Sequence, residues 1–472
     1  MESKIFSHIK RILYICSSET DVSELVFSAK YIHMEFYNRE KEIKELLNTQ
    51  KHSLENAQMT VVTGRRRIGK TQLLLEATEG QPTLYFFVAR KAESFLCQDF
   101  AQEIKEKLGI PILGEVNSFG ELFKFLMELS KTQSFNLIID EFQEFFNIAP
   151  SVYSDVQHYW DVNKDQSKMN LLLSGSVHSL MHKIFQNSKE PLFGRATALL
   201  RVKSFETSVL KEILADHNRD YTSEDLLALY TFTGGVAKYV QLLMNSGSYT
   251  LEAMLNYIIR EDSTFIPEGK NMLIEEFGKE YANYFTILSA IARGENTRAK
   301  MEAVVNREIG GYLTKLEHDY GLISKVTPIF SKVETKNVRY TLEDNFLSFW
   351  FRFIYKYSYM VEVGGYEQLK EIVVRDYPTF SGKILERYFK ARYIEQMRFT
   401  RIGGYWDRKG ENEIDMVAVN ELDETADIIE VKRNAANINL EKLREKGVHF
   451  MKATGELSDY KVNYKTLSMN DM

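Results

Sequence analysis

The stretch Thr60-Val-Val-Thr-Gly-Arg-Arg-Arg-Ile-Gly-Lys-Thr71 decides the fold of this chain, because it reads G-x-x-x-x-G-K-T directly after a short β-branched run. This is the pattern of a phosphate-binding loop. Gly64 and Gly69 let the backbone curl so that successive N–H groups face phosphate oxygens. Lys70 is then predicted to contact the β- and γ-phosphates, and Thr71 to bind Mg²⁺ through its hydroxyl. The stretch therefore predicts a site for ATP and Mg²⁺.

The sequence around this loop predicts an α/β fold. Apolar runs alternate with longer amphipathic stretches such as 95–108 and 119–129, and the runs lie at residues 60–63, 83–88, 136–139 and 170–173. Such alternation is typical of a parallel sheet covered by helices. Ligands of such sheets bind beyond the carboxyl ends of the strands, where the phosphate loop begins.

A second motif follows at Phe135-Asn-Leu-Ile-Ile-Asp-Glu141, an apolar run that ends in two carboxylates. Downstream of a phosphate loop this pattern is typical of the acidic strand that completes a Mg²⁺ site. We expect Asp140 to hold Mg²⁺ through water and Glu141 to orient or deprotonate the attacking water. The alternative is that both are solvated turn residues.

Two further residues are candidates for contact with the γ-phosphate. Ser174 ends the apolar run Leu171–Leu173 and is predicted to sense that phosphate from a neighbouring strand. Arg195 follows the turn-forming Gly194, and its planar guanidinium is suited to developing phosphate charge. An ordinary surface arginine is an equally good interpretation of Arg195.

The length of 472 residues and the 44% hydrophobic content suggest several domains. A second methionine, Met34, marks the expected start of the ATPase domain, so that the preceding residues form an extension. The predicted divisions are 1–33 (extension), 34–205 (P-loop ATPase core), 206–275 (helical lid), 276–355 (winged helix) and 356–472 (nuclease-like domain).

The winged-helix prediction rests on the order of three helices and two strands between residues 277 and 355. Residues 310–318 are the expected recognition helix and residues 332–336 the wing. Residues 295–340 contain eight Lys or Arg against six Asp or Glu, an excess of only two. Affinity for DNA follows the number of phosphates neutralised, so we expect regulatory packing against the ATPase core rather than strong DNA binding.

The last hundred residues carry a second candidate site. Residues two apart in a strand share a face, so Glu413 and Asp415 point one way, as do Glu430 and Lys432 on the next strand. Converging carboxylates of this kind hold Mg²⁺ over a scissile phosphate, while the lysine stabilises charge or positions water. The alternative is a set of solvent-facing salt bridges across a hairpin.

Composition narrows the cellular context. The net charge of −6 gives no chain-wide attraction to nucleic acid, so any such contact must be local. The two cysteines, Cys16 and Cys97, form no disulfide framework, which favours a reducing compartment, and we expect a cytoplasmic protein. No apolar run approaches the roughly 20 residues needed to cross a bilayer, so we expect no membrane partner.

Together these motifs resemble a prokaryotic ATPase family of the AAA/STAND group, whose members carry a C-terminal domain of unknown function (DUF234) related to PD-(D/E)XK nucleases. The resemblance covers residues 34–434 and rests on segments 36–40, 64–71, 137–142, 174–176, 191–195, 234–235 and 349–350, and on Asp415, Glu430 and Lys432. It implies that Arg39 and Glu40 lie near the nucleotide base, that Ser174 is at the sensor position and that Arg195 is a candidate arginine finger. It also implies that Glu386 is the helical acid that precedes Asp415 at the nuclease-like site. The family's usual proline after the glycine pair is Ala237 here.

Three interpretations of function remain open at this point. The first is an ATP-driven switch that controls a metal-dependent nuclease with metal ligands Glu386, Asp415 and Glu430. The second is a non-cleaving, ATP-dependent regulator that binds DNA or protein through its winged helix. The third is an ATPase interaction module with a C-terminal scaffold. Besides ATP, the candidate partners are DNA or RNA, a second copy of the chain and a regulatory protein.

Overall fold

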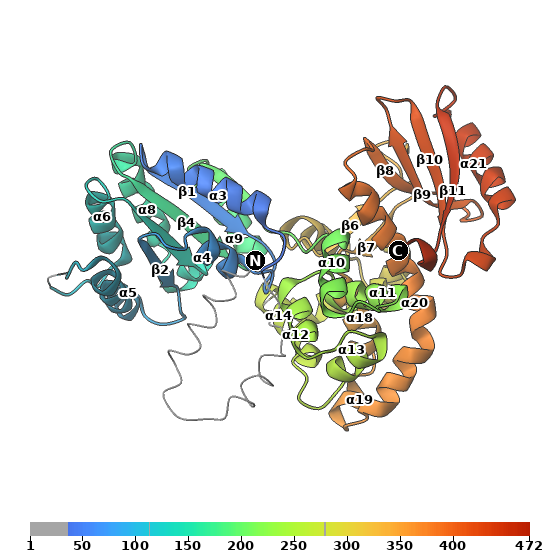
Figure 1. Ribbon diagram of the computed structural model, residues 1–472, viewed down its shortest axis with the longest axis horizontal. Helices are drawn as coiled ribbons and strands as arrows, with labels where there is room; N and C mark the ends of the chain where they lie inside the picture. The colour runs from blue at the N-terminus through green and yellow to red at the C-terminus, as the bar shows by residue number, and fades with distance from the viewer. Residues whose placement is uncertain (1–35, 113, 278–279) are drawn as a thin grey trace.

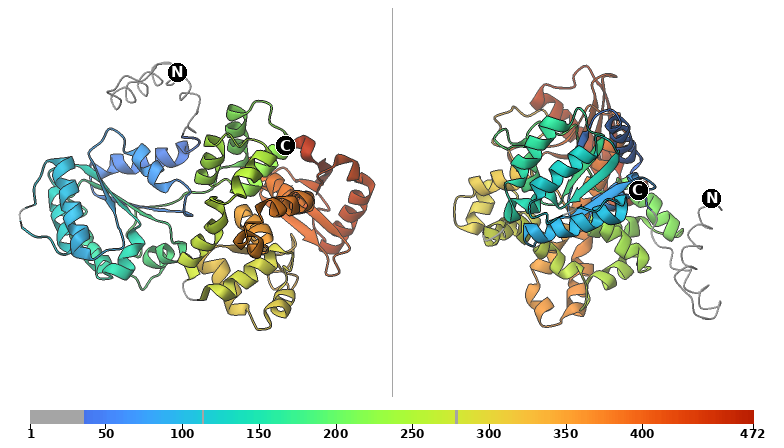
Figure 2. Two further views of the ribbon diagram at one scale, coloured as in Figure 1. Left: turned by 90° about the horizontal axis from the view of Figure 1, so that it is seen from below. Right: turned by 90° about the vertical axis from the view of Figure 1, so that its left-hand side faces the viewer.

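A computed structural model describes residues 36–112, 114–277 and 280–472. The predicted extension 1–33, and Cys16 within it, lie outside the described residues. The chain forms three successive parts, with a parallel sheet at one end, a helical middle and a second sheet at the other end (Figures 1 and 2). The order of these parts in space follows their order in sequence.

The first part is a five-stranded parallel sheet with the strand order β2-β3-β4-β1-β5. Its strands are β1 (Gln58–Thr63), β2 (Thr83–Phe87), β3 (Phe135–Asp140), β4 (Met169–Gly175) and β5 (Ala198–Arg201). The four apolar runs of the sequence are the first four strands. The edge strand β5 was not predicted, because only alternate residues of its four-residue run are half-buried and the others are exposed.

Helices cover both faces of this sheet, as the alternation of apolar runs predicts. Alternate residues of β1 face opposite sides, so that Val62 contacts one layer and Val61 the other. The layer on the Val62 side contains α3 (Glu40–Ser53) and α4 (Lys70–Ala77). The opposite layer contains α5 (Glu93–Leu108), α6 (Phe119–Leu129), α8 (Val152–Asn163) and α9 (His178–Gln186).

The middle part begins with the expected helical segment. Its helices are α10 (Thr207–His217), α11 (Ser223–Thr233), α12 (Ala237–Asn245), α13 (Leu251–Ile258) and α14 (Phe265–Phe277). The elements predicted as a winged helix then follow in the expected order: α15 (Tyr281–Ala292), α16 (Arg298–Val305), α17 (Gly310–Thr314), β6 (Ile323–Val326) and β7 (Arg339–Leu342). The expected recognition helix is not one regular helix, because residues 315–319 widen into a π-helical turn.

Aromatic packing joins this middle part to the C-terminal third. The segment after β7 forms α18 (Asn345–Phe349) and a π-helical turn at residues 350–355, and α19 (Ser358–Glu362) and α20 (Tyr366–Glu395) follow. Phe232 of α11 contacts Phe349 of α18 at a ring-centroid distance of 4.7 Å and Tyr377 of α20 at 5.8 Å. One continuous hydrophobic core therefore extends from the ATPase sheet through the helices to the second sheet.

The second sheet is mixed, with the strand order β11-β10-β9-β8. Its elements are β8 (Arg401–Trp406), β9 (Glu413–Asn420), β10 (Thr425–Val431), α21 (Leu440–Thr454) and β11 (Lys461–Leu467). β9 and β10 form the predicted antiparallel hairpin, and β11 runs parallel to β10. The predicted α/β fold, with a parallel ATPase-type sheet and a separate C-terminal α/β domain, is confirmed. None of the helices within the described ranges is both long and apolar enough to cross a membrane.

Candidate functional site

The phosphate loop connects β1 to α4, as its motif predicts. Gly69 has φ 95°, a left-handed conformation that favours glycine, and a Cβ atom at Gly64 would lie 2.7 Å from the carbonyl oxygen of Val202. Lys70 donates hydrogen bonds from Nζ to the carbonyl oxygens of Gly64 (2.9 Å) and Arg65 (3.2 Å). The ammonium group thus lies within the loop that is predicted to bind phosphate.

The two acidic residues of β3 lie beside the loop. The Thr71 hydroxyl donates a 2.6 Å hydrogen bond to Asp140, and the Tyr85 hydroxyl contacts the same carboxylate oxygen at 2.9 Å. Hydroxyl and carboxylate oxygens are ligands that Mg²⁺ accepts, so these residues fit the expected ion. Burial lowers the pKa of the Lys70 ammonium, while the neighbouring Glu141 and Asp140 carboxylates oppose that shift.

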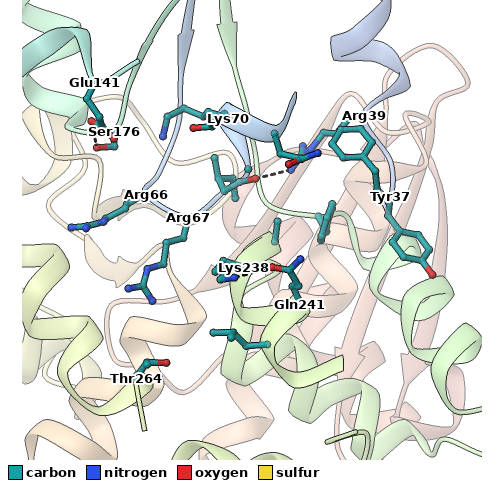
Figure 3. A pocket seen from close by; sticks show the side chains of 18 residues that line it. Tyr37, Arg39, Arg66, Arg67, Lys70, Glu141, Ser176, Lys238, Gln241 and Thr264 are labelled. Atoms are coloured by element: carbon teal, nitrogen blue, oxygen red, sulfur yellow. Dashed lines mark hydrogen bonds between the residues drawn. The ribbon is translucent and has the colours of Figure 1, made fainter. Parts of the chain in front are cut away.

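A cavity of about 730 Å³ opens beside the loop and is the place where a nucleotide fits (Figure 3). Lys70, Glu141 and Ser176 lie along one side of it in the close-up view, and Arg39 and Tyr37 lie on the other. The first group is polar and charged, as contact with phosphate and Mg²⁺ requires. The second side adds aromatic surface from Phe36, Tyr37 and Phe205, which suits a base.

Several predicted residues line this cavity together, namely Arg39, Gly69, Lys70, Thr71 and Glu141. Arg39 is buried, and it donates a hydrogen bond to the carbonyl oxygen of Lys203 at 2.8 Å. Its guanidinium carbon lies 5.1 Å from the ring centroid of Phe205. Asp140 lies just behind the cavity wall, bonded to Thr71.

Two predicted γ-phosphate contacts do not line the cavity. Ser174 is enclosed within β4, and its hydroxyl is buried without a hydrogen-bond partner among the described residues. Ser176, just beyond the strand end, lines the cavity instead and donates a 2.8 Å hydrogen bond to Glu141. Arg195 forms an ion pair with Asp161 at 2.8 Å, away from the cavity.

The sequence did not single out three other cavity residues, Arg66, Arg67 and Gln241. Arg66 and Arg67 come from the variable positions of the phosphate loop and line the cavity (Figure 3). Gln241 comes from α12, as does Lys238, which the sequence offered as a candidate nucleotide contact with an ordinary solvated lysine as the favoured alternative. The Lys238 backbone N–H bonds to the Arg67 carbonyl at 3.1 Å, which fixes α12 against the loop. Two sequence features could have identified these cavity residues: the run of three arginines in the phosphate loop and the Gly-Gly turn before α12.

The remaining arginine contacts of the loop reach the helical middle part. Arg65 forms an ion pair with Asp344, and its guanidinium carbon lies 5.4 Å from the ring centroid of Tyr239. Arg67 forms an ion pair with Glu268 at 3.0 Å. Glu268 also accepts a 2.7 Å hydrogen bond from the Tyr239 hydroxyl. The loop is therefore bonded to α14 and to the start of α18.

The predicted C-terminal residues come together at the β9–β10 hairpin. Asp415 accepts hydrogen bonds from the Val431 N–H (2.9 Å) and from Lys432 Nζ (3.3 Å). Lys432 also lies 3.4 Å from Glu430, whose Oε1 is 3.7 Å from Lys446. The other carboxylate oxygen of Glu430, Oε2, is buried and has no hydrogen-bond partner in the described part of the chain.

The helical acid predicted to join this cluster is on α20. Burial raises the pKa of Glu386 to about 7, Lys383 opposes the shift, and Asp415 adds to it. Glu413 is directed elsewhere, because it forms an ion pair with Arg339 at 2.8 Å. Within residues 36–112, 114–277 and 280–472 there is no group of three or more His, Cys, Asp and Glu side chains arranged to hold a metal ion.

Comparison with known proteins agrees with this arrangement. Residues 36–243 match a family described as "ATPase domain predominantly from Archaea". Residues 350–445 match the family DUF234, described as "Archaea bacterial proteins of unknown function". The chain therefore contains a segment similar to an archaeal ATPase domain, followed by a segment similar to a DUF234 domain. The ATPase domain thus contains the phosphate loop, and the DUF234 domain contains Glu386, Asp415, Glu430 and Lys432.

One relative is similar to this chain over most of its length. The uncharacterized protein MJECL04 of Methanocaldococcus jannaschii is 29% identical over 407 residues, covering 84% of this chain and 87% of its own. Among solved structures, the Walker-type ATPase PABY2304 of Pyrococcus abyssi is similar with a TM-score of 0.50 and 20% identity, covering 66% of this chain and 95% of its own. The ORC2 protein of Aeropyrum pernix gives a TM-score of 0.48 and 16% identity, covering 71% of this chain and 96% of its own. The Pyrococcus structure supports the fold of the ATPase part.

Proposed function

We propose that this protein is an ATP-binding and ATP-hydrolysing switch that controls its C-terminal domain. The observation that carries the proposal is the cavity of about 730 Å³ at the phosphate loop, with Lys70 and Thr71 on its wall. Arg66, Arg67 and Lys238 add positive charge to the same cavity, which favours a triphosphate. The aromatic side chains near Arg39 are suited to the base.

Hydrolysis in this proposal depends on Glu141. Its carboxylate lies on the cavity wall and accepts a hydrogen bond from Ser176, which orients it toward the place of the attacking water. Thr71 and Asp140 are the residues that would hold Mg²⁺, which neutralises charge on the phosphates. Ser176 is the better candidate for the sensor role first assigned to Ser174.

The arginine-finger role of Arg195 would require a second copy of the chain, because this residue is paired with Asp161 outside the cavity. The domain divisions at residues 34, 206, 276 and 356 remain part of the proposal. The last of these boundaries, at residue 356, falls inside one continuous helical layer, because Tyr377 of α20 packs against α11.

The proposed effector is a metal-dependent nuclease-like site in the DUF234 domain. Asp415 and Glu430 would hold the metal, Glu386 would complete the set, and Lys432 would stabilise charge at the scissile phosphate. The unpartnered Oε2 of Glu430 supports this, because a buried carboxylate oxygen without a partner is costly unless it binds a proton donor or a cation.

A second candidate is a non-cleaving, ATP-dependent regulator. It is favoured by Lys432, which lies within 3.4 Å of both Asp415 and Glu430 and neutralises them without a metal. It is also favoured by the absence of a metal-type cluster among the described residues. In that case the winged-helix-like segment would contact DNA or a protein.

One experiment separates the two candidates. The full-length protein is incubated with labelled DNA and RNA, with Mg²⁺ or Mn²⁺, with and without ATP, and compared with Asp415→Asn and Lys432→Ala. The switch-and-nuclease proposal expects cleavage that both variants lose, and weaker Mn²⁺ binding in calorimetry for Asp415→Asn only. Glu441→Gln, on the exposed face of α21, is the matched control. Absence of cleavage under every condition, together with unchanged Mn²⁺ binding in Asp415→Asn, would leave the regulator as the function.

A further inference from the structure

A second cavity, of about 700 Å³, lies between the β6–β7 ribbon and the DUF234 domain. Its walls come from β6, the loop that follows it, α20 and the edge strand β8. The loop is fixed to β8 because the Ile329 N–H donates a 2.8 Å hydrogen bond to the Gly404 carbonyl. β6 and β7 lie beside β8 in Figure 1, and no residue that lines this cavity also lines the cavity at the phosphate loop. This cavity is therefore distinct from the nucleotide site.

Arg387 of α20 is the central cation of this cavity. Its hydrogen bonds both come from Nη1 and go to neutral groups, the Asn345 side-chain oxygen at 3.1 Å and the Ser348 hydroxyl at 3.3 Å. No carboxylate within the described residues forms an ion pair with it, and the side chain is only partly exposed. A guanidinium whose other donors remain available is suited to an anionic ligand.

Three further cations line the same cavity, namely Lys325 of β6, Lys390 of α20 and Arg401 of β8. Neither lysine forms an ion pair in the part of the chain that the structure describes. Arg401 has only an exposed partner, Glu421 at 3.3 Å. The cavity has one acidic lining residue, Glu343, which is hydrogen-bonded by the Ser324 hydroxyl. The lining thus carries four cationic side chains against one carboxylate.

An aromatic residue completes the wall. Phe330 has φ 62°, a left-handed conformation that is rare for a bulky residue and is held only where the surroundings impose it. The guanidinium carbon of Arg401 lies 5.0 Å from the centroid of its ring. The Arg401 side chain is 51% exposed, so its planar group is accessible to a flat ligand such as a nucleobase.

We propose that this cavity is a second binding site, for a phosphate ester carried by a free nucleotide or by a nucleic-acid strand. Arg387 and Lys390 contact the phosphate, and Arg401 with Phe330 contacts the base. Both ligands present the same chemistry, a phosphate beside a planar base. The site lies where the winged-helix-like segment meets the DUF234 domain, so its occupancy affects their relative position.

The test uses full-length Lys70→Ala protein, in which the phosphate loop has lost its main contact with nucleotide. Pyrophosphate and ADP are titrated by calorimetry. Fluorescein-labelled single-stranded DNA and RNA 12-mers are titrated by fluorescence anisotropy. Binding of at least one of these probes is expected. The added substitutions Lys325→Ala and Lys390→Ala, neither of which breaks an ion pair, should weaken that binding at least tenfold.

The control is Lys442→Ala with Lys452→Ala in the Lys70→Ala background, since both lysines are exposed on α21. It should bind the probes as the Lys70→Ala protein does.

Arg387→Gln should abolish binding, whereas Arg387→Lys should keep part of it, and circular dichroism establishes that both remain folded. If ADP binds and the 12-mers do not, the ligand of this cavity is a free nucleotide. If the 12-mers bind, the ligand is a nucleic-acid strand. If no probe binds, or if the cavity and control lysine pairs weaken binding equally, the proposal is wrong. This test measures binding in the Lys70→Ala protein, so its result does not depend on whether the protein hydrolyses ATP.

Discussion

The guanidinium group of Arg65, in the phosphate loop, forms an ion pair with Asp344, the residue that caps α18. Asp344 also accepts a 2.9 Å hydrogen bond from the Leu347 N–H. Burial lowers the pKa of Arg65, and its Nε and Nη2 have no hydrogen-bond partner among the described residues. The groups that stabilise its charge are Asp344, the nearby Glu268 carboxylate and the rings of Tyr239 and Phe346. We expect this pair to transmit a change in the loop on nucleotide binding to α18.

The first prediction concerns the stability that this pair provides. Asp344→Asn keeps an oxygen for the Leu347 N–H but leaves the buried guanidinium without its counter-charge. Removal of one partner of a buried ion pair costs about 3–5 kcal/mol, so we expect the free energy of unfolding to fall by that amount in urea titrations. The exposed pair Lys370–Glu367 is the control, and Glu367→Gln should change stability by less than about 0.5 kcal/mol. Equal effects of the two variants would contradict the assigned role of Asp344.

The same variant tests the coupling. In hydrogen exchange, ATP should change the protection of residues 345–349 in the wild-type protein and not in Asp344→Asn. If ATP changes their protection equally in both proteins, the signal does not pass through this ion pair.

The second prediction concerns Lys70. Lys70→Ala removes the ammonium group that is predicted to contact the terminal phosphates, while the loop glycines remain. Affinity for ATP should fall at least roughly 100-fold, about 2.7 kcal/mol, in calorimetry. Lys44→Ala, on the exposed side of α3, should bind ATP normally. Unchanged ATP affinity in folded Lys70→Ala would overturn the phosphate-loop assignment.

The third prediction separates hydrolysis from binding. Glu141→Gln should bind ATP as the wild type does but turn it over about 10²–10⁴ times more slowly, because a general base acts on the transition state. The nearby Glu144 is paired with Arg90 at 2.8 Å, so Glu144→Gln is the matched control and should keep the rate. Equal turnover in wild type and Glu141→Gln would remove Glu141 from the mechanism.

The fourth prediction follows from the pKa of Glu386, which burial raises to about 7. An unfolded glutamate titrates near about 4.3, so the folded state holds this proton more tightly. The stability that this residue contributes is therefore complete below pH about 4.3, and it is lost as the pH rises toward 7. We expect a loss of about 3–4 kcal/mol across that range, since one pKa unit corresponds to about 1.4 kcal/mol.

Glu386→Gln carries no titrating proton and should lack this loss. The difference in unfolding free energy between variant and wild type should therefore increase between pH 5 and pH 7.5, measured in urea. The control Glu441→Gln removes an exposed carboxylate paired with Arg444 and should give no such trend. A difference that does not change with pH would mean that Glu386 titrates normally.

Part of this protein was predictable because the signals are local. The phosphate loop, the acidic end of β3 and the four apolar strands each lie in one short segment, and periodicity reports burial directly. The assignment of Arg39 came from a family resemblance, and the structure places this residue on the cavity wall. The edge strand β5 was not found, since four residues with half-buried alternation give too weak a pattern.

Tertiary structure decided the rest, because side chains far apart in sequence meet only when the elements pack. The sequence determined that β4 ends in serines, but only the folded sheet encloses Ser174 and leaves Ser176 on the cavity wall. The sequence likewise contains Arg65 and Asp344 with nothing to connect them. The packing of α18 against α11 and α12 brings that carboxylate to the phosphate loop, where a desolvated guanidinium requires a counter-charge.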